Sequence, residues 1–216
     1  MSPMQPGTLL GLAAVGASGL VVSSMFGSKV VFYANQGEGV AEFRRAGAWA
    51  GQALRTSAVH PIGTAADFLS TIRSYPRIAR FVWVGHGTTT SLFVGGGLRV
   101  RGGDIDVLAE ELAPRLALGA IVGLAACSAA ADPGQSGWNA ETYSDGGAQS
   151  LAGTLRDGIF RRAPWLLLGE VRGHTAAGNT IANPAGRYFP LREPGRPGHG
   201  IDLRSSDPER WIVGAA

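Results

Sequence analysis

The side chains best suited to chemistry in this chain are one of its four histidines and its only cysteine. His86 lies in FVWVGHGTTT, residues 81 to 90, and Cys127 lies in AIVGLAACSAA, residues 120 to 130. A thiol with a pKa of about 8.5 is mostly protonated at neutral pH, whereas an adjacent imidazole can accept its proton or stabilise the thiolate. The pair therefore predicts a reactive cysteine if the fold brings the two residues together.

Each of the two residues follows an apolar stretch that is typical of a central strand in a parallel sheet. Neighbouring strands lie about 4.8 Å apart, so strands that end at the same edge would place His86 and Cys127 in one cleft. Gly85 and Gly87 allow tight backbone geometry beside the histidine. The backbone amides of Gly87 and Cys127 are predicted to point at a developing oxyanion.

Strand and helix patterns alternate along the chain, which predicts a three-layer α/β/α sandwich with a mostly parallel central sheet and right-handed crossovers. Thr64 and Asp104 are expected to cap helices, and Pro61 limits its strand to an edge of the sheet. We expect strands at 29–36, 56–63, 77–87, 119–129 and 164–173, a hairpin at 91–103, and helices at 39–55, 64–75, 104–113 and 145–162.

Composition divides the chain into three segments. Residues 1–28 carry no charged side chain, residues 29–190 form the main domain, and residues 191–216 form a Pro, Gly and Arg-rich tail that is expected to be irregular. Residues 8–26 approach the roughly 20 residues needed to span a bilayer, but nearly half are Gly, Ala or Ser. Two interpretations stay open: a membrane-inserting helix, or a helix packed against the domain or a partner. The chain is accordingly expected in the cytoplasm or as a secreted protein, with membrane association through this segment as one option.

Several classes of function receive no support from the sequence. The net charge is +3 with a pI near 9.5, but the basic residues are scattered singly or in pairs, so no nucleic-acid groove is expected. The histidines show no metal-ligand spacing, so neither a metal nor another cofactor is expected. One cysteine cannot form an intrachain disulfide. A serine esterase is disfavoured because no G-x-S-x-G motif occurs.

The two strand ends resemble the signature of the caspase-like cysteine peptidases of clan CD, which include legumains, gingipains, separases and CHAT-domain proteins. The resemblance covers residues 29–175: an apolar strand ending in His-Gly, a hairpin and a helix, then a strand ending in a small residue and Cys. The separation of about 40 residues is similar to the roughly 50 of caspases. The resemblance implies that His86 is the general base, that Cys127 is the nucleophile in peptide-bond hydrolysis, and that Gly87 belongs to the oxyanion hole. No Gln-Ala-Cys-x-Gly motif appears, so caspase-type aspartate specificity is not implied.

The remaining polar candidates have more than one interpretation. His174 also follows an apolar strand, and is a rival base, a wall of the cleft or a loop histidine. Asp132, Glu141, Asp145 and Glu170 are expected near the same edge, either as a pocket for a basic substrate side chain or as solvated surface groups. Asp145 is also a candidate helix cap. The other two histidines, His60 and His199, are expected to be structural or exposed.

The leading prediction is a cysteine endopeptidase that acts on a protein or peptide, as a bacterial effector or toxin with an inhibitor or immunity protein as its partner. Two alternatives stay open. One is a catalytically silent binding or scaffold module of the same fold. The other is a different cysteine-dependent acyl hydrolase, because a thiol, a base and oxyanion donors serve acyl transfer in general.

Overall fold

The computed structural model describes residues 27–88, 91–95, 98–101, 103–131, 146–175 and 185–202, to which the structural statements below refer. The expectation for residues 8–26 lies outside them. Within the described residues, no helix is both long and apolar enough to cross a bilayer.

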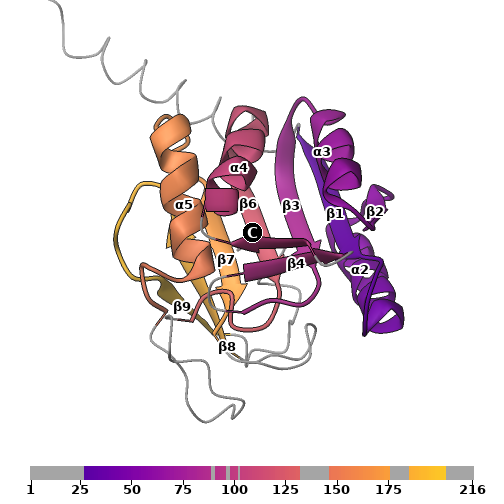
Figure 1. Ribbon diagram of the computed structural model, residues 1–216. Coiled ribbons are helices and arrows are strands. Elements are labelled where there is room, and N and C mark those ends of the chain that lie inside the picture. Colours follow the sequence, from indigo (N-terminus) through magenta and orange to yellow (C-terminus); the bar gives the residue numbers. More distant parts are fainter. Residues whose placement is uncertain are drawn as a thin grey trace, which may run out of the picture.

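The described residues form an α/β fold around a seven-stranded, mostly parallel sheet in the order β2-β1-β3-β6-β7-β8-β9 (Figure 1). The α/β class is thereby confirmed. Strands β4 and β5 form a separate antiparallel hairpin, as expected for residues 91–103. The strands are β1 (Ser28–Ala34), β2 (Val59–Ile62), β3 (Ile78–Val84), β4 (Ser91–Gly95), β5 (Leu98–Arg101), β6 (Leu116–Ala125), β7 (Glu170–His174), β8 (Ala185–Pro190) and β9 (His199–Asp202), and the helices are α2 (Val40–Leu54), α3 (Ala65–Arg73), α4 (Gly103–Leu112) and α5 (Leu151–Arg162).

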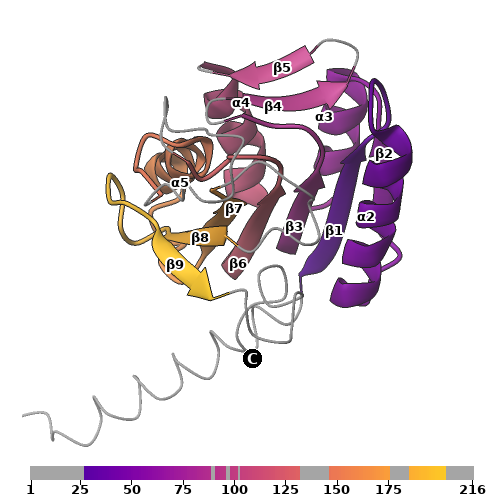
Figure 2. The same ribbon diagram turned by 90° about the horizontal axis from the view of Figure 1, so that it is seen from below.

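Helices lie on both faces of the sheet. Successive side chains of a strand point to opposite faces, and in β1 the ring of Phe32 packs on Phe68 of α3 while Tyr33 lies against Gly47 of α2. Figure 2 shows α3, α4 and α5 together on one side of the row of strands, with the β4-β5 hairpin beyond them. The sheet is therefore covered by α2 on one face and by α3 on the other, and these helices form separate layers.

The two strands expected at the centre of the sheet are β3 and β6, and they are direct parallel neighbours. Their pairing runs from Ile78 and Leu116 to Val84 and Ala125. Apart from Arg80, every residue of β3 is buried, which explains the continuous apolar run in the sequence.

The helix caps were predicted with mixed success. Thr64 caps α3 as expected, and it forms a capping box with Asp67, whose amide lies 3.1 Å from the Thr64 hydroxyl. Asp104 is not a cap, because α4 already begins at Gly103. The helix expected from residue 145 begins at Leu151, and Ser150 caps it by accepting a hydrogen bond from the Gly153 amide at 3.1 Å.

The C-terminal part of the domain differs most from the expectation. The strand expected at 164–173 is shorter than predicted: it is β7, which begins at Glu170. Residues expected to be an irregular tail include β9, which pairs antiparallel with β8. The fully buried Arg156 of α5 helps to hold this region, because its Nη1 donates to the Arg196 carbonyl at 2.9 Å and its guanidinium lies 5.7 Å from the Phe189 ring centroid.

Strand β2 is the outermost strand on one side of the sheet, as Pro61 led us to expect. The Ala58 carbonyl, just before β2, accepts from the Val31 amide of β1, and the Ile62 carbonyl accepts from the Asn35 amide just after β1, at 2.9 Å each. Because backbone groups alternate in direction along a strand, the nitrogen of Pro61 faces away from β1, where no hydrogen bond is required of it.

His60, also in β2, gives the fold a pH dependence. Its Nε2 lies 2.6 Å from the Tyr75 hydroxyl, and burial lowers its pKa below the ordinary 6.5. The unfolded chain then binds a proton more readily than the folded chain does, so stability is fully present above pH 6.5 and is lost as pH falls through the lower folded pKa. We expect the free energy of unfolding, measured by urea titration, to decline below pH 6.5, and to decline less in His60→Gln. An equal decline in both proteins would assign the effect to other groups.

Candidate functional site

His86 and Cys127 follow the ends of two hydrogen-bonded neighbours at the same edge of the sheet. The last register pair is Val84 with Ala125, and the Gly85 amide continues the ladder by donating to the Ala125 carbonyl at 3.2 Å. His86 and Cys127 each lie two residues beyond that pair. The carboxyl edge of β3 and β6 thus places both candidate residues on adjacent chain segments.

The imidazole of His86 is held from the side of α2. Its ring meets the Phe43 ring edge-on, with 4.7 Å between centroids and 88° between planes, and its Nε2 lies 3.1 Å from the Glu38 carbonyl oxygen. A carbonyl only accepts, so this hydrogen bond places the ring proton on Nε2 and leaves Nδ1 as the basic nitrogen. The His86 side chain is exposed to solvent.

Cys127 is half-buried, carries no disulfide and opens a tight turn. The next residue, Ser128, adopts a left-handed conformation with φ 52°, and its carbonyl accepts from the Ala131 amide at 3.0 Å. The turn is tied to two neighbouring elements: the Ala130 amide donates to the His174 carbonyl, and the Ala152 amide donates to the Ala129 carbonyl, both at 2.8 Å. Such anchoring fixes the backbone that carries the thiol.

Gly87 comes into close contact with the cysteine turn. A Cβ at this position would lie 2.7 Å from the Ala126 Cβ and 3.3 Å from the Cys127 carbonyl oxygen. Only glycine fits here without a shift of backbone, because the first of these separations is far below carbon van der Waals contact. The segments after β3 and β6 therefore stay side by side beyond the last strand pair.

The other predicted site residues are placed less favourably or not described. His174 ends β7 at the same edge, but its side chain is only 2% exposed, and its backbone carbonyl supports the cysteine turn. Glu170 was wrongly expected near this edge: it begins β7, about 13 Å down the strand, and accepts from Arg172 Nε at 2.6 Å. Asp132, Glu141 and Asp145 lie outside the described residues.

Sequence reasoning missed Glu38, because its contribution is a backbone carbonyl that no side-chain pattern marks. The available signal was Gly-Glu-Gly at 37–39. Gly39 precedes α2 with φ 81°, which turns the Glu38 carbonyl toward His86. Among the described residues, no group of three or more His, Cys, Asp or Glu side chains could hold a metal ion.

Gly39 can be used to test whether the Glu38 contact aligns His86. In Gly39→Ala, the new Cβ would lie 3.2 Å from Phe43 Cζ and 3.5 Å from His86 Nε2. A left-handed alanine also costs about 1–2 kcal/mol. We expect iodoacetamide to alkylate Cys127 about tenfold more slowly in this variant, because the imidazole shifts from its alignment.

Gly37→Ala is the matched control for that variant. Gly37 has φ 91°, and a Cβ there would have nothing within 4 Å. It should lose a similar amount of stability and keep the wild-type alkylation rate. Equal losses of rate in both variants would show that backbone strain, and not the orientation of His86, controls the thiol.

The chain was compared with protein-family models, with curated proteins and with solved structures. None of the three comparisons found a match. The chemistry of the edge that carries His86 and Cys127 is therefore the basis for assigning a function.

Proposed function

We propose that this protein is a cysteine endopeptidase of caspase-like architecture, in which His86 and Cys127 are the catalytic dyad. The observation that carries the proposal is the direct parallel pairing of β3 and β6, which end two residues before His86 and Cys127. The hairpin β4-β5 and helix α4 between these strands support it, because the same order of elements occurs in the caspase-like peptidases that the sequence resembles.

In the proposed reaction, Nδ1 of His86 accepts the thiol proton and the Cys127 thiolate attacks the scissile carbonyl carbon. The carbonyl electrons move to oxygen, and the amides of Gly87 and Cys127 donate hydrogen bonds to the oxyanion. Collapse of this intermediate breaks the C–N bond, and His86 protonates the leaving amine. Water, deprotonated by His86, then hydrolyses the thioester and restores the thiol. The backbone carbonyl of Glu38 accepts the hydrogen bond from Nε2–H in every step and so stabilises the imidazolium.

The substrate class in this proposal is a protein or peptide. The carboxylates of Asp132, Glu141 and Asp145, which lie outside the described residues, are the candidates from the sequence for pairing with a basic side chain before the scissile bond. A series of peptide probes that differ only at this position tests the assignment directly.

Active-site labelling tests the proposal, because the chain contains a single cysteine. The protein is incubated with peptidyl acyloxymethyl ketones carrying Arg, Asp, Asn or Leu before the reactive group, and modification is followed by mass spectrometry. We expect Cys127 to be modified in the folded protein, fastest by the arginine probe. Cys127→Ala should show no modification.

The urea-unfolded protein is the control, since its cysteine has ordinary thiol reactivity. Slower labelling of folded than of unfolded protein, with no preference among probes, would favour a silent binding module. Rapid labelling by activated acyl esters without cleavage of any peptide would instead favour another cysteine-dependent acyl hydrolase. Fast labelling by every probe would contradict the preference for a basic residue but would still support the catalytic dyad.

A further inference from the structure

The loop between α5 and β7 exposes three large apolar side chains at the opposite edge of the sheet from His86 and Cys127. Trp165 is 65% exposed, Leu167 49% and Leu168 54%, while Leu166 between them is buried and anchors the loop. Exposed apolar side chains that cluster in this way mark an interaction surface in soluble domains. We call Trp165, Leu167 and Leu168 the apolar loop.

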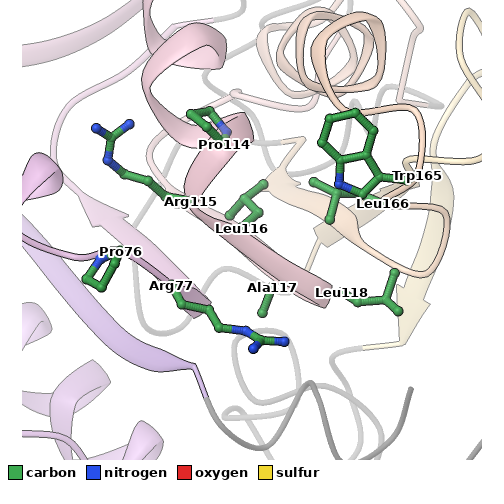
Figure 3. Close-up of a pocket in the computed structure, with 9 residues that line it drawn as sticks. All are labelled: Pro76, Arg77, Pro114, Arg115, Leu116, Ala117, Leu118, Trp165 and Leu166. Carbon is green, nitrogen blue, oxygen red and sulfur yellow. The ribbon is translucent and has the colours of Figure 1, made fainter. Parts of the chain in front are cut away.

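A pocket of about 440 Å³ adjoins the apolar loop (Figure 3). Figure 3 shows Trp165 on one side of Leu116 and Arg115 on the other, with Arg77 below. The residues that line the pocket are therefore a tryptophan, two arginines, and otherwise prolines and aliphatic residues. That combination suits a ligand with both a negative charge and an apolar part.

Positive charge extends around the pocket. Arg161 and Arg162, at the end of α5 next to the apolar loop, both contact the same Asp106 oxygen, at 2.7 and 3.3 Å. Likewise Arg73 and Arg115 both contact the carboxylate of Glu111. Each of these two carboxylates thus contacts two arginines. Each group of one carboxylate and two arginines therefore carries a net positive charge.

The uncharged N-terminal segment joins the domain at the same place. The Ser28 amide donates to the Arg77 carbonyl at 2.8 Å, and Ser28 pairs with Ile78 at the start of β3. Residues 1–28 carry no charged side chain. The chain therefore leads an apolar segment to the edge that bears the apolar loop and the arginines.

We propose that this edge of the domain docks on an anionic lipid surface, with the apolar loop inserted at the interface and Arg77 and Arg115 contacting headgroup phosphates. Tryptophan favours the membrane interface because its ring is apolar and its N–H is polar. Arginines beside it add attraction to anionic headgroups. A protein partner would also cover apolar side chains, but the adjoining uncharged segment favours lipid. The proposal is independent of the peptidase assignment.

Tryptophan quenching in the full-length chain tests the docking. Vesicles of brominated phosphatidylcholine, with or without an equal part of phosphatidylglycerol, are titrated with wild type and with Trp165→Phe. Residues 1–28 contain no tryptophan, so insertion of that segment alone gives no signal. We expect strong quenching by the anionic vesicles in wild type and the loss of most of it in Trp165→Phe.

The arginines are tested by Arg77→Gln/Arg115→Gln. Each basic side chain near an anionic surface strengthens binding roughly fivefold, so the double variant should bind these vesicles about 30-fold more weakly. Arg44→Gln/Arg45→Gln is the matched control, because it removes the same charge from exposed positions of α2. It should bind nearly as wild type does.

Three results would overturn the proposal. The first is that wild type and Trp165→Phe give the same quenching, or that neither is quenched, which would show that Trp165 does not enter the bilayer. The second is equal weakening by the two arginine double variants. The third is concentration-dependent self-association, measured by sedimentation without vesicles, that Leu167→Ser/Leu168→Ser abolishes, which would identify a second copy as the partner.

Discussion

His86→Ala is expected to slow both the alkylation of Cys127 and any peptide hydrolysis by about 10²- to 10⁴-fold, the usual contribution of a general base. The reason is geometric: His86 follows β3 and Cys127 follows β6, two directly paired strands, and the Glu38 carbonyl leaves Nδ1 as the basic nitrogen. Without the imidazole, the thiol depends on solvent to remove its proton. Second-order rate constants with iodoacetamide and with the peptide probes measure the effect.

His60→Gln is the matched control for the loss of a histidine, because β2 lies two strands away from β3. It should react as wild type does at pH 7.5. His174→Gln tests the rival base, with circular dichroism to confirm folding because the side chain is buried. Unchanged reactivity in His86→Ala combined with loss in folded His174→Gln would transfer the role of base to His174.

Gly87→Ala is expected to reduce Cys127 reactivity about 10²-fold, as misplacement of a reacting group by roughly 1 Å does. The added methyl carbon would lie 2.7 Å from the Ala126 Cβ, so the two segments must move apart. Overpacking of this kind also costs about 1–3 kcal/mol of stability. Stopped-flow alkylation and urea unfolding measure the two effects separately.

Ala126→Gly provides the rescue for that variant, because it removes the carbon against which the new methyl would press. In Gly87→Ala/Ala126→Gly we expect most of the reactivity to return, and the double-mutant cycle to show a favourable coupling between the positions. Additive losses would mean that Gly87 acts through its backbone conformation, and that the contact with Ala126 is unimportant for the thiol.

The strand ends could be predicted from the sequence because β3 and β6 are buried on both faces. A strand that is buried on both faces needs a continuous run of apolar residues, and such a run precedes both His86 and Cys127. Adjacent parallel strands then have their carboxyl ends at the same edge of the sheet. The role of Glu38 could not be predicted in the same way. A carbonyl is common to every residue, and its direction depends on the left-handed turn at Gly39 and on packing between segments far apart in sequence.

Two other differences have local causes. The Leu166 to Leu168 run has the composition of a buried strand, but a short apolar run does not by itself distinguish a strand from a loop, and only Leu166 is buried. The region around β8 and β9 has the Pro and Gly content of a loop. It is ordered by contacts that the local sequence does not reveal, including the Arg156 bond to the Arg196 carbonyl and the Asp157 bond to the Gly195 amide at 3.0 Å.

The position of Pro61 in β2 also bears on how this domain avoids aggregation. An outermost strand offers unpaired amides to any other polypeptide that is ready to extend the sheet. Here that strand has four residues, and the nitrogen that faces outward at Pro61 has no hydrogen to give. Intermolecular strand addition is thereby discouraged on this flank of the described seven-stranded sheet, whose other outermost strand is β9.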